Sequence, residues 1–236
     1  MKKICLSSIS LFIFLAVENT LLRQSEITGA WTAKQGTVTN TLVFQNGYFS
    51  FVSFDIPNKK FIHTYGGTFS FSGGQVHANI EFDTKNKDAA GTHIHFAAVV
   101  EGNKLKLDAG NGTGEWTKVD EGKDALAGNW RVTGRMNKGQ MEEIPVSARK
   151  TLKLMSGTRF QWIAMNTETK EFSGTGGGTY SFKDGKYIEN IEFFSRDSSR
   201  VGASLSFEGI VENNKWTHKG LNSKGEPIQE IWTREK

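Results

Sequence analysis

Three of the five histidines lie close together in the first half of the chain, where they could bind a metal ion. His77, His93 and His95 fall, with Glu81, on two neighbouring segments that we expect to pair as antiparallel strands. In that pairing Glu81 lies opposite His93, and Asn79 lies opposite His95. Imidazole and carboxylate groups are good ligands for zinc and similar ions. A metal-dependent site is therefore one hypothesis, and an ordinary solvated face of a sheet is the other.

Motifs that would mark a catalytic centre are absent from the sequence. Neither a Gly-x-Ser-x-Gly elbow nor a His-Glu-x-x-His pair occurs. The glycine-rich run at 174–178 lacks the Gly-Lys-Ser/Thr that follows in a phosphate loop, so we expect a bend before a strand at 179–183. We predict a non-enzymatic protein with no catalytic residues, no bound metal and no cofactor. Glu81 and Glu192 recur at matching places, either as polar anchors inside each unit or as solvated side chains.

Composition excludes several classes of protein. The chain has 236 residues, a formal net charge of +4 and a single Cys. One Cys excludes a disulfide framework and a cysteine-based zinc site. The small net charge is spread evenly, so we expect no nucleic-acid partner.

The first 25 residues predict export. Lys2 and Lys3 precede an apolar run that ends before Glu18, which is the pattern of a secretory signal peptide and is too short for a spanning helix. We expect cleavage, a secreted or periplasmic protein and no stable membrane span after processing. An uncleaved anchor is the alternative. Cys5 lies in this leader, so the mature chain would contain no cysteine.

An internal repeat organises the rest of the chain. Nine of the sixteen residues at 67–82 recur at 178–193, 111 positions later. We therefore expect a first unit at 26–120, a linker at 121–125 and a second unit at 126–236.

Each unit is predicted to be all-β. Pairs such as Asn46-Gly47, Gly73-Gly74 and Asp184-Gly185 punctuate the apolar runs and suit tight hairpin turns. Val76, Ala78, Ile80 and Phe82 alternate with polar residues, as in a half-buried strand. Glu189 interrupts the corresponding apolar face of the second unit. A meander of eight or nine strands hides its edges best by closing, so we expect two related small antiparallel barrels in tandem, with a two-sheet sandwich as the alternative.

The first strand of each unit carries a Gly-x-Trp, at Trp31 and at Trp130, and the last carries a basic residue after Trp-Thr, Lys118 or Arg234. This arrangement resembles the lipocalins, and the second unit is similar to secreted lipocalin-like bacterial proteins of undefined ligand. The resemblance implies that the tryptophan plugs one end of the barrel and that the basic side chain packs across its ring.

If a barrel retains a cavity, aromatic side chains are expected to line it. The candidates for ligand binding are Phe69, Phe71, Trp162, Tyr180, Phe182 and Phe207. The function that we expect is that of an exported binding protein for a small, mostly apolar molecule. The alternatives are the metal-dependent site at His77, Glu81, His93 and His95, or a structural role in which the insert at 134–148 meets an envelope protein.

Overall fold

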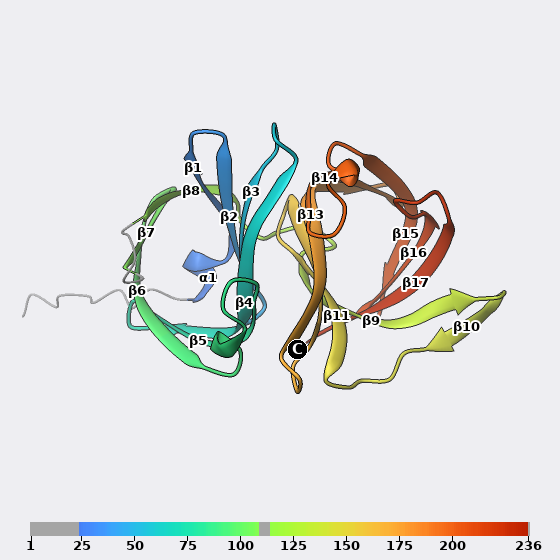
Figure 1. The fold of residues 1–236 in the computed structure, drawn as a ribbon, viewed down its shortest axis with the longest axis horizontal. Helices are drawn as coiled ribbons and strands as arrows, with labels where there is room; N and C mark the ends of the chain where they lie inside the picture. Colours follow the sequence, from blue (N-terminus) through green and yellow to red (C-terminus); the bar gives the residue numbers. More distant parts are fainter. Residues whose placement is uncertain (1–23, 109–113, 236) are drawn as a thin grey trace, which may run out of the picture.

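The first half of the protein is a closed eight-stranded antiparallel barrel, in which each strand pairs with its neighbours in sequence and β1 also pairs with β8 (Figure 1). The computed structural model describes residues 24–108 and 114–235. A short helix, α1 (Gln24–Ile27), precedes the barrel, and a 3-10 turn (Lys87–Ala89) joins β5 to β6. The strands are β1 (Gly29–Gln35), β2 (Val38–Gln45), β3 (Tyr48–Asp55), β4 (Lys60–Ser72), β5 (Gln75–Asp83), β6 (His93–Glu101), β7 (Lys104–Asp108) and β8 (Gly114–Asp120).

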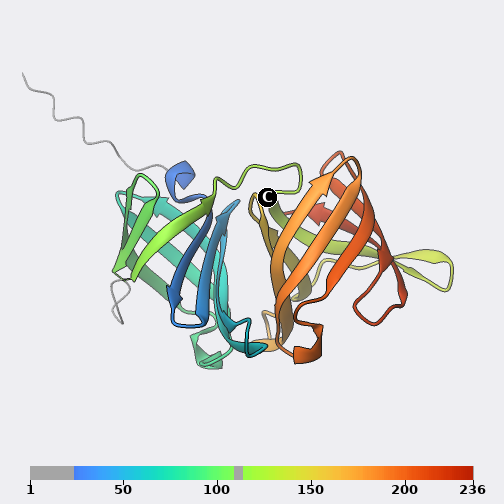
Figure 2. The ribbon, with the colours of Figure 1, turned by 90° about the horizontal axis from the view of Figure 1, so that it is seen from above.

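The second half repeats this barrel and adds one hairpin. Pairing of β9 with both β11 and β17 closes the sheet, and β10 pairs only with the far half of β9, so this arm stands out from the barrel (Figure 2). A 3-10 turn (Ser198–Arg200) joins β14 to β15. The strands are β9 (Gly128–Asn137), β10 (Gln140–Glu143), β11 (Arg149–Met155), β12 (Arg159–Asn166), β13 (Glu171–Lys183), β14 (Lys186–Phe194), β15 (Ser204–Glu212), β16 (Lys215–Leu221) and β17 (Pro227–Arg234).

The predicted fold class, two small antiparallel meander barrels in tandem, is confirmed, and neither unit is an open sandwich. Tight turns make the meander, because residues such as Asn46, Gly47 and Asp184 adopt the positive φ that two-residue hairpins require. The predicted leader, residues 1–25, lies almost entirely outside the described residues, which begin at Gln24.

A buried tryptophan lies at the same end of each barrel. Trp31 Nε1 donates to the carbonyl of Ile27, and Trp130 Nε1 donates to the carbonyl of Leu126, at 2.8 and 2.7 Å. The ammonium of Lys118 lies 5.0 Å from the Trp31 ring centroid, and the guanidinium carbon of Arg234 lies 4.1 Å from that of Trp130. The two tryptophan–cation pairs expected from the sequence are thus in contact.

The two barrels meet through equivalent strands, β2–β5 of the first and β11–β14 of the second (Figure 1). Phe82 of the first barrel stacks on Phe172 of the second, with ring centroids 6.0 Å apart. Phe193 of the second barrel lies 6.5 Å from Phe61 of the first, and these residues are the repeat equivalents of Phe82 and Phe172. The contact is therefore close to twofold symmetric, like an isologous dimer interface built within one chain.

Asp120, the last residue of β8, ties the first barrel to the β11–β12 turn of the second. Its carboxylate accepts hydrogen bonds from Ser156 Oγ, the Gly157 amide, and the amide and hydroxyl of Thr158, at 2.7 to 3.0 Å. Burial alone would raise the pKa of Asp120, but these donors, with the Gly122 amide, outweigh it and lower the pKa below its ordinary value.

Candidate functional site

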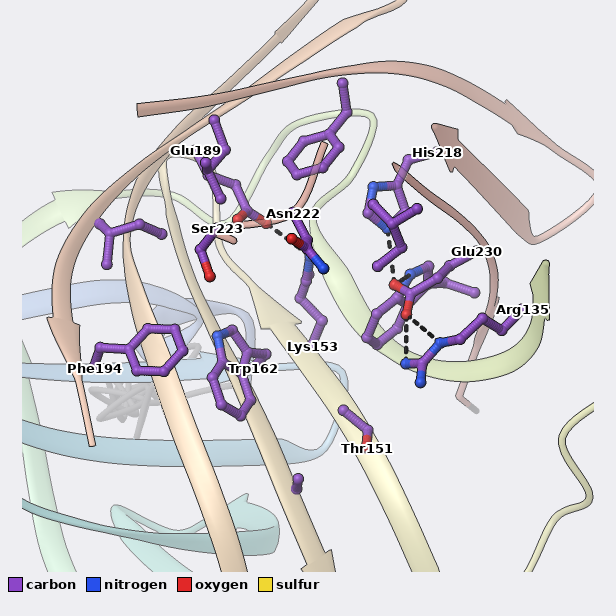
Figure 3. A pocket seen from close by; sticks show the side chains of 16 residues that line it. Arg135, Thr151, Lys153, Trp162, Glu189, Phe194, His218, Asn222, Ser223 and Glu230 are labelled. Carbon is purple, nitrogen blue, oxygen red and sulfur yellow. Dashed lines mark hydrogen bonds and ion pairs between the residues drawn. The ribbon is translucent and has the colours of Figure 1, made fainter. Parts of the chain in front are cut away.

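The second barrel contains a cavity of about 300 Å³, at the small end of the range for ligand sites (Figure 3). One part of its wall is apolar and largely aromatic, and another carries charged side chains from four different strands. The apolar wall includes Trp162, Ile191, Phe194, Leu205, Phe207, Ile228 and Trp232, and the polar groups are Arg135, Thr151, Lys153, Glu189, His218, Asn222, Ser223 and Glu230.

A buried ion pair lies inside this cavity. Lys153 Nζ, from β11, lies 2.7 Å from Glu189 Oε1, from β14, and the two side chains are only 5% and 7% exposed. The hydroxyl of Tyr187 donates to the same oxygen at 2.7 Å. Burial, followed by the charge of Glu189, raises the pKa of Tyr187 well above its ordinary value. The Tyr187 hydroxyl therefore stays protonated and is the donor in this hydrogen bond.

Four aromatic rings surround the Lys153 ammonium. The distances from Nζ to the ring centroids are 5.0 Å for Trp232, 5.1 Å for Trp216, 5.4 Å for Tyr187 and 5.8 Å for Phe160. Cation–π attraction at such distances is strongest where the cation has lost its water, as here. The rings and Glu189 together replace the hydration that Lys153 loses on burial.

Glu230 organises a second charged group beside the first. Its Oε1 accepts from Arg135 Nε at 2.9 Å and Nη2 at 2.5 Å, and its Oε2 accepts from the His218 and Trp232 ring nitrogens, each at 3.1 Å. Burial favours the protonated acid, but the His218 hydrogen bond and the nearby positive charges of Arg135 and Lys153 outweigh it and lower the pKa of Glu230 to about 2. Burial lowers the pKa of His218, so the ring is neutral near pH 7 and donates from Nε2.

The first barrel has apolar residues where the second has this network. Strand register pairs Trp31 with Leu42 and Trp130 with Lys153, so Leu42 corresponds to Lys153. By the same comparison Ala78 corresponds to Glu189, and Leu107 to His218. The first barrel therefore folds with an apolar interior at these positions, and the buried charges of the second are not a requirement of the fold.

The network falls within the part of the chain that has a family match. Residues 125–236 match the model of a domain of unknown function, DUF4488. The matched residues comprise the second barrel with its cavity and its β10 arm. No curated protein matches the chain. Within the described ranges, no helix has the length and apolar character needed to cross a membrane.

Two of the six predicted lining residues, Trp162 and Phe207, line the cavity. Tyr180 lies in the core of the second barrel and donates to the Ser156 carbonyl at 2.7 Å, and Phe182 packs against that core. The remaining two, Phe69 and Phe71, lie in the core of the first barrel.

The glycine-rich run lies inside β13, not in a bend before it, which corrects the expectation from sequence. A Cβ at Gly176 would lie 2.7 Å from Trp162 Nε1 and 2.9 Å from Phe194 Cδ2. A Cβ at Gly177 would overlap the Phe160 carbonyl and lie 2.6 Å from Phe193 Cζ. These glycines let the aromatic rings lie flat against the strand, on the cavity side and on the interface side.

Three of the four proposed metal ligands, His77, His93 and His95, line one surface pocket of the first barrel, with the His77 and His95 ring centroids 6.5 Å apart, but Glu81 is not among them. The register pairs His77 with His95 and Asn79 with His93, two residues away from the expected alignment. The 3-10 turn before β6 causes this shift, because the chain returns to β5 only at Ile80. Glu81 instead accepts from Tyr48 and pairs with Lys150 across the interface, at 2.7 and 2.9 Å. No group of three His, Cys, Asp or Glu side chains in the described residues could hold a metal ion.

Glu192, the repeat equivalent of Glu81, is bound in the same way on the outside of its barrel. It pairs with Arg159, which occupies the position of Tyr48 in the repeat. The recurring glutamates are therefore neither anchors inside a barrel nor freely solvated, since their side chains are 14% and 20% exposed.

Sequence reasoning missed the residues that give the cavity its chemistry: Lys153, Glu189, His218, Glu230 and Arg135. One signal was present, because Glu189 breaks the apolar side of its strand between Tyr187 and Ile191. A charged residue on an otherwise apolar strand face indicates a buried polar site.

Proposed function

We propose that this protein is an exported, non-enzymatic, lipocalin-like binding protein that holds a small, mostly apolar molecule in its second barrel. The observation that carries the proposal is the cavity of about 300 Å³, whose wall combines aromatic side chains with a buried Lys153–Glu189 pair. Ligand sites of this kind are mostly apolar and use few polar groups to orient the ligand.

The contrast between the barrels supports a functional origin for the polar groups. Burying an ion pair is often no more stabilising than well-packed apolar residues of similar volume. The first barrel has that apolar solution, Leu42 and Ala78, at the matching positions. The presence of Lys153 and Glu189 in the second barrel is therefore best explained by a ligand that uses them.

Export is part of the proposal and is supported by the N-terminal pattern alone. Two lysines and a short apolar run begin the chain, as in secretory signal peptides. Fractionation of cells expressing the full chain, with the N-terminus of the product sequenced, tests this part. Recovery of the intact leader in the cytoplasm would refute export and leave the binding proposal standing.

Binding is tested with the neutral fluorescent dye N-phenyl-1-naphthylamine after bound molecules have been stripped from the protein. We expect saturable fluorescence enhancement with one site, and its loss on Leu205→Asp, which places a charge in the apolar wall at a half-buried position. Phe71→Asp in the first barrel is unsuitable as a control because it disrupts a core, so the exposed Ile210→Asp serves instead. Absence of saturable enhancement in the wild type would refute the proposal.

Interaction with an envelope protein is a second candidate, favoured by the β9–β10 arm (Figure 2). The insert at 134–148 forms this arm, and Val146 is 76% exposed beside a surface groove lined by Met141, Ile144 and Ile231. Capture of a defined envelope protein that is lost with Val146→Asp but kept with Ile210→Asp would support this role. Equal capture by both variants would refute it.

A further inference from the structure

Two side-chain acceptor atoms on buried residues that line the cavity have no partner among the described residues, and one of them, His218 Nδ1, is fully buried. Glu189 Oε1 accepts from both Lys153 and Tyr187, whereas Oε2 accepts no hydrogen bond from any residue that the structure describes. Glu230, in contrast, uses both oxygens and accepts four hydrogen bonds. Glu189 also lines the cavity, and 7% of its side chain remains accessible. Its second oxygen is thus an anionic acceptor left open toward the cavity.

The Lys153 ammonium is not open in the same way. One of its three donors is directed at Glu189 Oε1, and the ring centroids of Trp216 and Trp232 lie 5.1 and 5.0 Å from Nζ. Its positive charge is shared between a carboxylate and aromatic faces. Of the Lys153–Glu189 pair, Glu189 Oε2 is therefore the atom that is free to accept a hydrogen bond from a ligand.

The charges on the cavity wall cancel. Lys153 is paired with Glu189, Arg135 is paired with Glu230, and His218 is neutral. A ligand with a net charge would add an uncompensated charge to a site of low polarity, which is unfavourable. A carboxylate would also meet Glu189 Oε2 as a like charge, and an ammonium would lie close to Lys153.

We infer that the cavity selects an uncharged amphipathic molecule whose head group donates a hydrogen bond to Glu189 Oε2, such as an alcohol or a primary amide. The apolar remainder lies against the wall formed by Trp162, Phe194, Leu205 and Phe207. This inference rests on the proposed binding function and adds the chemical class of the ligand. Fatty acids and alkyl amines, which are charged at neutral pH, are excluded by it.

Four probes of equal chain length test the inference: octan-1-ol, octanamide, octanoate and octylammonium. Each displaces N-phenyl-1-naphthylamine from the full-length mature protein at pH 7, and Kd is derived from the displacement curve. We expect the alcohol and the amide to bind at least about tenfold more tightly than octanoate, which cannot donate to Glu189 Oε2, since a hydrogen bond to a charged acceptor contributes about that much. Octylammonium can donate, but it would bury a second positive charge beside Lys153, so we expect it also to bind more weakly than the neutral probes. Equal affinity for all four, or preference for an ion, would overturn the inference.

A double variant tests whether Glu189 is the origin of the preference. Lys153→Leu/Glu189→Ala installs the residues found at the matching positions of the first barrel, Leu42 and Ala78, which that barrel accommodates. We expect this variant to bind the dye but to bind octan-1-ol and octanamide at least about tenfold more weakly than the wild type, because the acceptor for their head groups is gone. Glu101→Ala/Lys106→Leu, which removes an exposed pair of the same 2.7 Å separation, is the matched control and should bind both as the wild type does.

The outcomes separate this inference from the proposed function. If neither the dye nor any of the four probes binds the wild type, the binding function itself fails. If the dye binds and the head groups are not distinguished, or if the double variant binds the alcohol and the amide as tightly as the wild type does, only the ligand class fails. The measurements on the wild type do not depend on the folding of any variant.

Discussion

Removal of one partner of the Lys153–Glu189 pair is predicted to cost far more stability than removal of both. Glu189→Ala leaves the Lys153 ammonium buried with aromatic rings but no counter-charge, and Lys153→Leu leaves the Glu189 carboxylate with only the Tyr187 hydroxyl. Breaking a buried pair typically costs about 3–5 kcal/mol. Replacement of both by Leu and Ala reproduces an apolar arrangement that the first barrel already contains, and we expect a cost below about 2 kcal/mol.

The coupling free energy follows from these values. The two single substitutions sum to about 6–10 kcal/mol, so a double variant that costs less than about 2 kcal/mol gives a coupling of at least about 4 kcal/mol. Equilibrium unfolding in urea, followed by tryptophan fluorescence, measures each value. Trp216 and Trp232 lie about 5 Å from the Lys153 ammonium and report on this region directly.

An exposed ion pair of the same length is the control for this cycle. Lys106 and Glu101 are also 2.7 Å apart, but their side chains are 52% and 61% exposed. Glu101→Ala should cost less than about 1 kcal/mol, because solvent screens an exposed pair. If Glu189→Ala costs no more than Glu101→Ala, the pair is not desolvated as the structure indicates, and the argument that a ligand accounts for it loses its basis.

Three further predictions concern the cavity wall, the interface and pH. Gly176→Ala should force the Trp162 ring toward the cavity and weaken N-phenyl-1-naphthylamine binding several-fold; unchanged affinity would show that the ring has room to move. Asp120→Ala should remove the hydrogen bonds between β8 and the β11–β12 turn and lower the urea midpoint, whereas an unshifted midpoint would contradict this role. The pKa of His218 is lowered in the folded state, and that of Glu230 is lowered from 4.5 to about 2, so protons bind preferentially to the unfolded chain and stability should fall as the pH drops below 6.5 and further between 4.5 and 2. Glu230→Gln should reduce the loss of stability in the lower of these two ranges, to which other carboxyl groups with a lowered pKa, such as Asp120, also contribute, and a stability that rises on acidification would refute both assignments.

The fold was predictable from local signals that the tertiary structure leaves intact. Turn pairs such as Asn46-Gly47 have the backbone conformation that their residue types favour. The repeat also predicted that both halves adopt one architecture, because nine of the sixteen residues at 67–82 recur at 178–193. Closure follows from pairing of the first and last strands of each unit, which carry the Gly-x-Trp and the basic residue.

Strand register was less predictable, because it depends on how many residues a loop consumes. The histidine cluster was aligned on the assumption that β5 and β6 pair up to Glu81. A 3-10 turn at Lys87–Ala89 occupies the connection, so pairing begins at Asn79 and His93. When the pairing of two strands shifts by two residues, each side chain stays on the same face of the sheet but lies opposite a different residue. The sheet was therefore predicted correctly, and the arrangement of the metal ligands was not.

Lys153 was missed because the alternation rule assumes that one face of a strand meets water. On β11, Leu152 and Leu154 point into the interface between the barrels, and Thr151 and Lys153 line the cavity. Both faces of β11 are therefore buried. From the sequence alone, Leu-Lys-Leu has the pattern of two core leucines on either side of an exposed lysine. Only the packing of one barrel on the other reveals that the lysine is the interior residue.

The duplication gives each barrel a different part in the molecule. The first barrel fills the matching interior positions with Leu42, Ala78 and Leu107, and presents β2–β5 to its neighbour. By covering Leu152 and Leu154, it removes water from the outer face of the strand that carries Lys153. The low polarity around the Lys153–Glu189 pair thus depends on both barrels, although every residue of the cavity belongs to the second. A single barrel with the same cavity residues would expose that strand face to solvent, and the first barrel is therefore part of the cavity's environment without contributing a residue to its wall.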